Sequence, residues 1–136
     1  MNIVDRYKNQ HKIILSLCRA LKESAILGVQ ENEMSSYISV LKTLDEILST
    51  HLESEDSYLY PRLAQDESLT IQTTSKRLHK EMSPITKVYK TYQEKYIVKS
   101  NILKEEKMFL KETDSLVDAL NKRIKKEEVE LYALLS

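Results

Sequence analysis

Apolar side chains recur along the chain at alternating spacings of four and three residues, and they do so in three long stretches. The stripes consist of Tyr7, His11, Ile14, Cys18, Leu21 and Ala25 in the first stretch, of Tyr37, Leu41, Leu44, Leu48, His51, Glu55 and Tyr58 in the second, and of Phe109, Thr113, Leu116, Leu120, Arg123, Glu127, Leu131 and Leu134 in the last. This alternation puts all members of a stripe on one side of an α-helix. Each stretch therefore predicts a long helix with one buried face.

The stretch between the second and the last stripe is less regular. Its apolar positions are Ile71, Leu78, Met82, Ile85 and Tyr89, and His79 lies at their border. Pro84 falls inside this stretch and predicts a kink, because proline lacks the backbone N–H and crowds the preceding turn. Asp66 and Ser68 are both candidates for the N-cap of this helix.

Helix-breaking residues are few, since the chain has one glycine and two prolines. Breaks are expected at 28–32, at 61–68 and, more weakly, at 100–101. They divide the chain into helical segments at about 3–28, 33–61, 67–99 and 102–135. Helices of this length joined by short turns are typical of an up-down-up-down four-helix bundle. We therefore expect an all-α fold, with residues 1–136 forming one bundle domain.

Several residues on or beside these stripes are polar, which is unusual for a buried face. They are His11, His51, Glu55, His79, Arg123 and Glu127. A charged side chain on such a face is costly unless it is paired or bound to a metal. Residues equidistant from the turn of an antiparallel hairpin lie side by side, so the three expected turns place all six in one layer of the bundle.

A layer of three imidazoles and two carboxylates inside a bundle is typical of a transition-metal site. These three histidines are all that the chain has, and an apolar face covers only about two to three positions in seven, so their shared placement argues against chance. Taken singly, a histidine on a helix stripe is more often a packed core residue than a ligand. That interpretation stays open for each of them alone.

Composition limits the partners. Lysine plus arginine and aspartate plus glutamate each number 21, so the net charge is zero, and we expect neither nucleic acid nor a membrane surface as a partner. Apolar runs are too short for a membrane span. Cys18 is the only cysteine, and the N-terminal stretch lacks the apolar core of a signal peptide, so we expect a cytoplasmic location.

The polar residues and their spacing resemble the hemerythrin-like, or HHE cation-binding, family over essentially the whole chain. The resemblance rests on His11, on the run HLESEDSYLYP at 51–61, on His79, and on the run RIKKEEVELY at 123–132. It implies a four-helix bundle around a non-haem di-iron site, in proteins that bind or sense oxygen or nitric oxide, sense or store iron, or handle peroxide. It further implies that His11, His51, Glu55 and Glu127 surround one iron, with Glu55 and Glu127 as bridges, and that His79 binds the second.

Two departures from the family pattern matter. Arg123 stands where the family has histidine, and the chain has three histidines where an oxygen carrier of the family uses five. A guanidinium cannot coordinate a cation, so we expect Arg123 to pair with Glu127, to reach Glu55, and to weaken or abolish the second metal position. The alternative is that Arg123 extends to the surface. Asp56, Glu81 and Glu128 flank the ligands and are expected on the solvated helix surface, where one of them could orient a ligand histidine.

The sequence therefore predicts one or two non-haem iron ions in a partly degenerate site, with a small ligand such as oxygen or nitric oxide. A metal-free interaction or regulatory module on the same fold is the main alternative. Histidine phosphotransfer is a weaker one, because it needs an exposed histidine. Nothing in the sequence points to a protein partner or to a particular substrate.

Overall fold

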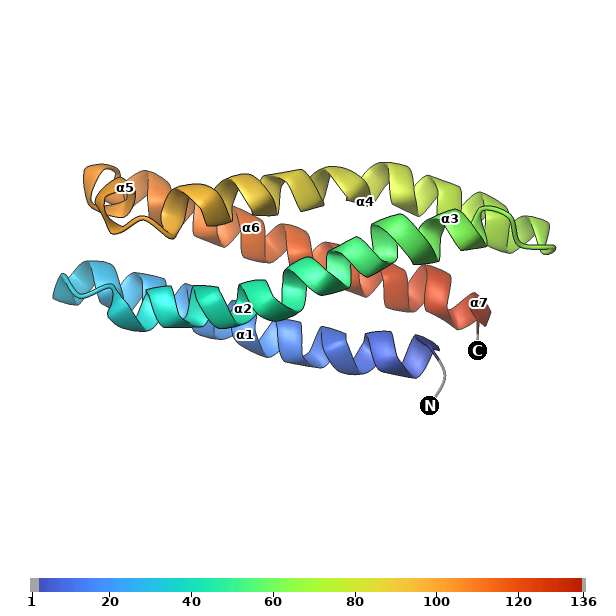
Figure 1. Cartoon of the computed structure of the whole chain (residues 1–136), viewed down its shortest axis with the longest axis horizontal. Helices are drawn as coiled ribbons and strands as arrows, with labels where there is room; N and C mark the ends of the chain where they lie inside the picture. The colour runs from blue at the N-terminus through green and yellow to red at the C-terminus, as the bar shows by residue number, and fades with distance from the viewer. Residues whose placement is uncertain (1–2, 136) are drawn as a thin grey trace.

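Four antiparallel helical rods make up the structure, a computed structural model that describes residues 3–135 (Figure 1). The first rod is α1 (Ile3–Glu31). The second joins α2 (Ser35–Ser54), the π-helical segment η1 (Glu55–Leu59) and α3 (Tyr60–Leu63). The third is α4 (Leu69–Tyr96), and the fourth joins α6 (Glu106–Lys126), the π-helical segment η2 (Glu127–Tyr132) and α7 (Ala133–Leu135). Residues 3–135 contain no strand, so the expected all-α bundle is confirmed.

The first turn differs from the expectation that the helix ends near Gly28. Helix α1 runs three residues further, and Asn32 ends it with a φ of 53° in the left-handed region that asparagine tolerates well. Gly28 instead serves close packing, because a Cβ atom there would lie 2.7 Å from the Sδ of Met34. The second turn has Ser68 as the N-cap of α4, with its hydroxyl accepting a hydrogen bond from the N–H of Ile71.

The third connection is also more structured than expected. A short helix, α5 (Lys99–Lys104), occupies the place where the sequence indicated a break at 100–101. Ile102 is fully buried and anchors this helix, while the side chain of Asn101 donates a hydrogen bond to the carbonyl of Lys95 near the end of α4. The helical backbone breaks instead at Val98 and at Glu105, on either side of α5. Helix α4 continues through Pro84 without interruption.

Two apolar clusters fill the bundle. The larger lies toward the end that carries the α1–α2 turn and α5, and includes Leu21, Leu44 and Phe109. The smaller lies toward the end that carries the termini, and includes Tyr7, Leu78 and Leu131 (Figure 1). Between them each rod presents its unusual polar residues. Within the described residues, no helix is long and apolar enough to cross a membrane.

Candidate metal centre

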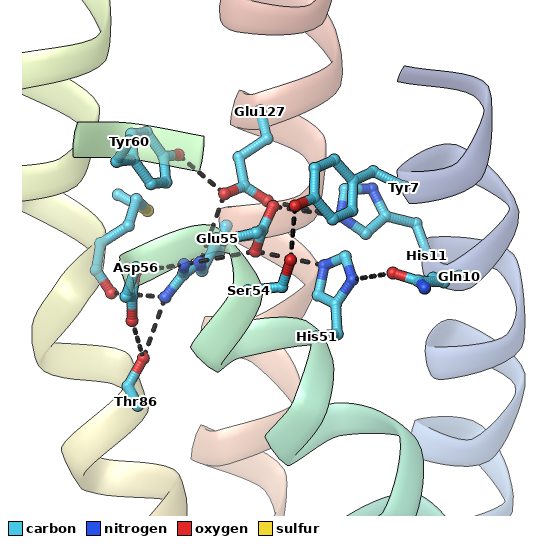
Figure 2. A network of polar contacts seen from close by, with 12 residues as sticks. Tyr7, Gln10, His11, His51, Ser54, Glu55, Asp56, Tyr60, Thr86 and Glu127 are labelled. Carbon is cyan, nitrogen blue, oxygen red and sulfur yellow. Dashed lines mark hydrogen bonds and ion pairs between the residues drawn. The ribbon is translucent and has the colours of Figure 1, made fainter. Parts of the chain in front are cut away.

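Four of the polar residues converge in the layer between the two apolar clusters (Figure 2). His11 comes from α1, His51 from α2, Glu55 is the first residue of η1 and Glu127 is the first residue of η2. One ligand atom from each of these four side chains lies within 4.8 Å of the others. Relative exposure is 3% for His51 and 0% for the other three, so the group is closed off from bulk water.

Three atoms of this group fit a metal ion. Among the described residues, the buried Nε2 atoms of His11 and His51 and the buried Oε1 of Glu127 have no hydrogen-bond partner. Buried polar atoms are almost always hydrogen-bonded, and each one left open costs about 1–3 kcal/mol. Three such atoms gathered in one place are what a bound cation would satisfy, and without one His11 Nε2 and Glu127 Oε1 are left in an ion-pair contact of 3.4 Å. Two imidazole nitrogens and carboxylate oxygens are a suitable donor set for iron, zinc or manganese.

The outer nitrogen of each imidazole is held by a second residue. The Nδ1 of His11 lies 2.8 Å from the Oε2 of Glu128, and the Nδ1 of His51 lies 2.6 Å from the Oε1 of Gln10. Both partners offer oxygens that only accept, so each Nδ1 donates its proton. With a metal bound, each imidazole would be neutral and would present the lone pair of Nε2 to the centre, which is the arrangement common to metal-binding histidines.

Arg123 is buried beside this group, with 1% exposure, so it does not extend to the surface. Its five N–H donors all have acceptors, which are Glu127 Oε2 at 3.4 Å, Glu55 Oε1 at 3.3 Å, Asp56 Oδ1 at 2.8 Å, the carbonyl of Met82 at 3.2 Å and Thr86 Oγ1 at 3.2 Å. The expected pairing of Arg123 with Glu127 and Glu55 is therefore present. The guanidinium links three of the four rods and brings a fixed positive charge to both carboxylates.

These contacts shift the pKa values of the two buried carboxyl groups, Glu127 and Glu55, in opposite directions. Burial raises the pKa of Glu127, and the nearby Glu55 raises it further, to about 7, against the lowering effect of His11 and Arg123. Burial also raises the pKa of Glu55, but the close contacts of its carboxylate with the imidazoles of His11 and His51 and the charge of Arg123 outweigh it and hold that pKa well below its usual range.

The histidine and arginine charges follow from the same contacts. Burial lowers the pKa of His11, yet its contacts with Glu127 and Glu55 outweigh burial and raise that pKa to about 10. Burial also lowers the pKa of Arg123, and the carboxylates of Glu127, Glu55 and Asp56 more than reverse it. Without a metal, two internal cations therefore balance the buried carboxylates.

Two tyrosines complete the layer. Tyr60 donates a hydrogen bond of 2.7 Å to Glu127 Oε2, and Tyr132 donates one of 2.7 Å to Glu55 Oε2. Burial, followed by the charge of the bonded glutamate, raises the pKa of each phenol, so both stay protonated donors. Each tyrosine follows a glutamate by five residues across a π-helical segment.

The sequence did not single out these two tyrosines, because it assumed a regular α-helix after each glutamate. That assumption placed Tyr58 on the buried face, whereas Tyr58 is 48% exposed. A π-turn closes its hydrogen bonds over five residues and shifts the buried face onward, here to Leu59 and Tyr60. The signal available in the sequence was the tyrosine at the fifth position after both glutamates.

His79 lies at the same height but outside the group. Its imidazole is 35% exposed, its Nε2 is 3.7 Å from Asp56 Oδ1, and its ring stacks on Tyr60 with centroids 4.8 Å apart. Asp56, expected on the solvated surface, instead turns toward Arg123, and its second oxygen accepts a hydrogen bond from Thr86. The side of the layer expected to hold a second metal is thus occupied by Arg123 and its partners.

A pocket opens beside the group between α1 and α2. Its volume is about 430 Å³, and its lining consists of Ile3, Arg6, Tyr7, Gln10, Thr50, His51, Ser54 and Tyr58. Among these lining residues, the hydroxyls of Tyr7 and Ser54 are hydrogen-bonded at 2.6 Å (Figure 2). The pocket brings solvent to the outer edge of His51, while Arg123 fills the opposite side of the layer.

A helical bundle that encloses a buried set of histidine and glutamate donors defines a class of cation-binding proteins. A comparison with protein families agrees, since the model of the hemerythrin HHE cation-binding domain matches residues 2–135. The chain therefore belongs to the hemerythrin HHE family. No curated protein and no solved structure matches it.

Proposed function

We propose that this protein binds one non-haem iron ion through His11, His51, Glu55 and Glu127. The observation that carries the proposal is the convergence of three partnerless buried atoms, the two imidazole Nε2 atoms and Glu127 Oε1. Iron bound by imidazole and carboxylate supplies redox chemistry and room for a small added ligand. The expected use is to sense or handle oxygen, nitric oxide or iron itself.

Arg123 supports binding of one ion rather than two. All its donors are used within the protein, so it is fixed in place, and it cannot act as a metal ligand. A second cation would meet this positive charge and would find Asp56 and the carboxylates already engaged. His79 remains a candidate ligand from the sequence, but the geometry gives it a partner role beside Tyr60 and Asp56.

The surroundings support a small ligand. The four donors are buried, and the pocket between α1 and α2 reaches only the outer edge of His51. A pocket of about 430 Å³ admits larger molecules as well, so the closed layer of donors, rather than the pocket, restricts the ligand to a small one. Cys18 is buried and free, which is consistent with the reducing conditions of the cytoplasm, the location that we propose.

Anaerobic titration with ferrous iron tests the proposal. We expect saturation at one iron per chain, with zinc and manganese measured by the same elemental analysis as competitors. Optical spectra taken before and after adding oxygen or nitric oxide to the loaded protein then distinguish the small ligands. Failure of the folded wild-type protein to retain any of these metals would overturn the proposal.

A metal-free regulatory module is the second candidate, and one observation favours it. Arg123 and a protonated His11 already balance the buried carboxylates, so the layer has counter-charges of its own. On this account the purified protein is folded, carries no metal and does not gain thermal stability when iron is added. Stabilisation by iron that saturates at one equivalent would exclude it.

A further inference from the structure

The two tyrosines of the polar layer are arranged reciprocally. Tyr60 follows Glu55 in the chain but bonds Glu127, and Tyr132 follows Glu127 but bonds Glu55. We infer that Tyr60 and Tyr132 are positioning residues that fix the orientation of each carboxylate, so that one of its oxygens is held by the phenol and the other is directed at the metal. This inference rests on the proposed metal binding and names two residues that control it.

The effect is clearest at Glu127. Its Oε2 accepts the hydroxyl of Tyr60 at 2.7 Å and faces the Nε of Arg123 at 3.4 Å, while its Oε1 has no hydrogen-bond partner among the described residues. Partial rotation of the carboxylate out of its present plane would break the bond to Tyr60 and turn the second oxygen away from the imidazoles. The phenol therefore keeps Oε1 directed at the two imidazoles.

Glu55 is held in the complementary way. Its Oε2 accepts the hydroxyl of Tyr132 at 2.7 Å, so Oε1 lies toward His51 Nε2 at 3.1 Å and toward Arg123 at 3.3 Å. Here Tyr132 shares its task with two groups, His51 and the guanidinium, which contact the other oxygen. At Glu127, by contrast, Tyr60 shares Oε2 with Arg123 alone among the described residues. We therefore expect a larger effect on metal binding from the loss of the Tyr60 hydroxyl than from the loss of the Tyr132 hydroxyl.

The rings of both tyrosines are themselves fixed. Tyr132 stacks on His11 with centroids 5.5 Å apart and on Tyr7 at 6.2 Å, and Tyr60 stacks on His79 at 4.8 Å. Relative exposure is 1% for Tyr60 and 0% for Tyr132, so water does not compete for either hydroxyl. A fixed donor in a dry site restricts the carboxylate more strongly than a mobile one.

Tyr37 provides a matched control for removal of a buried hydroxyl. It is fully buried in the larger apolar cluster and donates a hydrogen bond of 3.0 Å to Tyr92, away from the metal layer. Replacement of tyrosine by phenylalanine at 37, 60 or 132 removes the same atom each time. Only the last two changes release a carboxylate of the proposed site.

Cobalt(II) titration of the full chain tests the inference, because bound cobalt reports affinity and coordination geometry through its visible absorption. We expect Y60F to bind cobalt about 10–100-fold more weakly with an altered spectrum, and Y132F to show a smaller change of the same kind. Y37F should keep the affinity and spectrum of the wild type. Thermal unfolding without metal shows that each variant is folded.

Two results would overturn the inference while the wild type binds cobalt. One is an unchanged affinity and spectrum in both Y60F and Y132F, and the other is an equal loss in Y37F. Should Y60F fail to fold, Y132F alone decides between these outcomes. A wild-type protein that binds no cobalt would instead contradict the proposed function, which is a distinct result.

Discussion

The bundle contains two buried polar layers, and they differ in how far their buried polar groups find hydrogen-bond partners within the protein. In the half with the larger apolar cluster, Tyr37 donates to Tyr92 at 3.0 Å, the Tyr92 hydroxyl lies 2.6 Å from that of Thr113, and Thr113 donates to the carbonyl of Phe109 at 2.7 Å. That chain ends on a backbone acceptor and needs nothing further. The metal layer also contains many internal hydrogen bonds, yet it leaves three convergent atoms open.

This difference in open atoms distinguishes polar groups that stabilise the fold from polar groups that are available to bind a ligand. The half with the larger cluster has one open atom among its described residues, the hydroxyl of Tyr96, and it stands apart from any other. In the metal layer the open atoms are two imidazole nitrogens and a carboxylate oxygen, with further partners that fix their direction. Convergence of open atoms, rather than burial of polar atoms, marks the functional layer.

Removal of a histidine from the open set should have the largest effect. We expect His51→Ala to weaken iron binding by more than the roughly 100-fold upper figure for loss of an outer partner, because a direct ligand disappears. Equilibrium competition against a chelator measures this change. His79→Ala is the control, and its affinity should stay at the wild-type value because its imidazole lies outside the group. An equal loss in both variants would return His79 to the ligand set.

Replacement of Arg123, the buried guanidinium, should change the number of metal ions that the protein binds. We expect Arg123→His to bind two metal ions per chain, because the change removes the fixed charge and adds an imidazole. Arg123→Met removes the charge without adding a ligand and should stay at one. Without metal, the methionine variant should lose about 3–5 kcal/mol of folding stability, since its carboxylates lose their buried partner. Elemental analysis and denaturant unfolding measure both effects, and a single metal in Arg123→His would contradict this explanation.

Obstruction of the pocket between α1 and α2 should slow access to the metal layer without changing its donors. We expect Thr50→Trp to slow both iron loading and iron removal by a chelator, with little change in equilibrium affinity, because Thr50 lines the pocket and its hydroxyl bonds the carbonyl of Glu46 rather than any of the four donors. Stopped-flow absorption measures both rates. Thr91→Trp, in a groove between α4 and α6, is a matched control. Equal rates in Thr50→Trp and the wild type would show that the metal enters elsewhere.

Interruption of the hydrogen-bond chain that runs from Tyr37 through Tyr92 and Thr113 should have the smallest effect. We expect Tyr37→Phe to lower folding stability by about 1 kcal/mol, the usual net contribution of one buried hydrogen bond. Urea unfolding of the metal-free protein measures this change. Iron affinity should stay unchanged, since the chain from Tyr37 to Phe109 has no contact with the four donors. A weakened iron site in this variant would show that the two layers are coupled.

The sequence predicts the four rods well because their stripes keep a helical period over many turns. It also predicts that His11, His51, Glu55 and Glu127 meet, since hairpin geometry and stripe position depend on regular helices alone. The ends of α1 and the presence of α5 depend on local choices, such as the left-handed Asn32 and the buried Ile102, which periodicity does not encode.

The partners of the donors are harder to predict because they depend on departures from regular helix. The segments η1 and η2 turn Tyr60 and Tyr132 inward, while Tyr58 lies on the surface. A π-turn has no strong sequence signature. Glu128 is one of three flanking acids that the sequence offers as a partner for a ligand histidine, and its contact with His11 confirms this, whereas the contact of Gln10 with His51 appears only when the helices are placed in three dimensions.

The most direct test of this account is anomalous diffraction at the iron edge from crystals of the iron-loaded protein. The account predicts one peak per chain, adjacent to the Nε2 atoms of His11 and His51 and the Oε1 of Glu127, with the Arg123 guanidinium still bonded to Glu55 and Asp56. Two peaks per chain, with Arg123 displaced from the carboxylates, would contradict it.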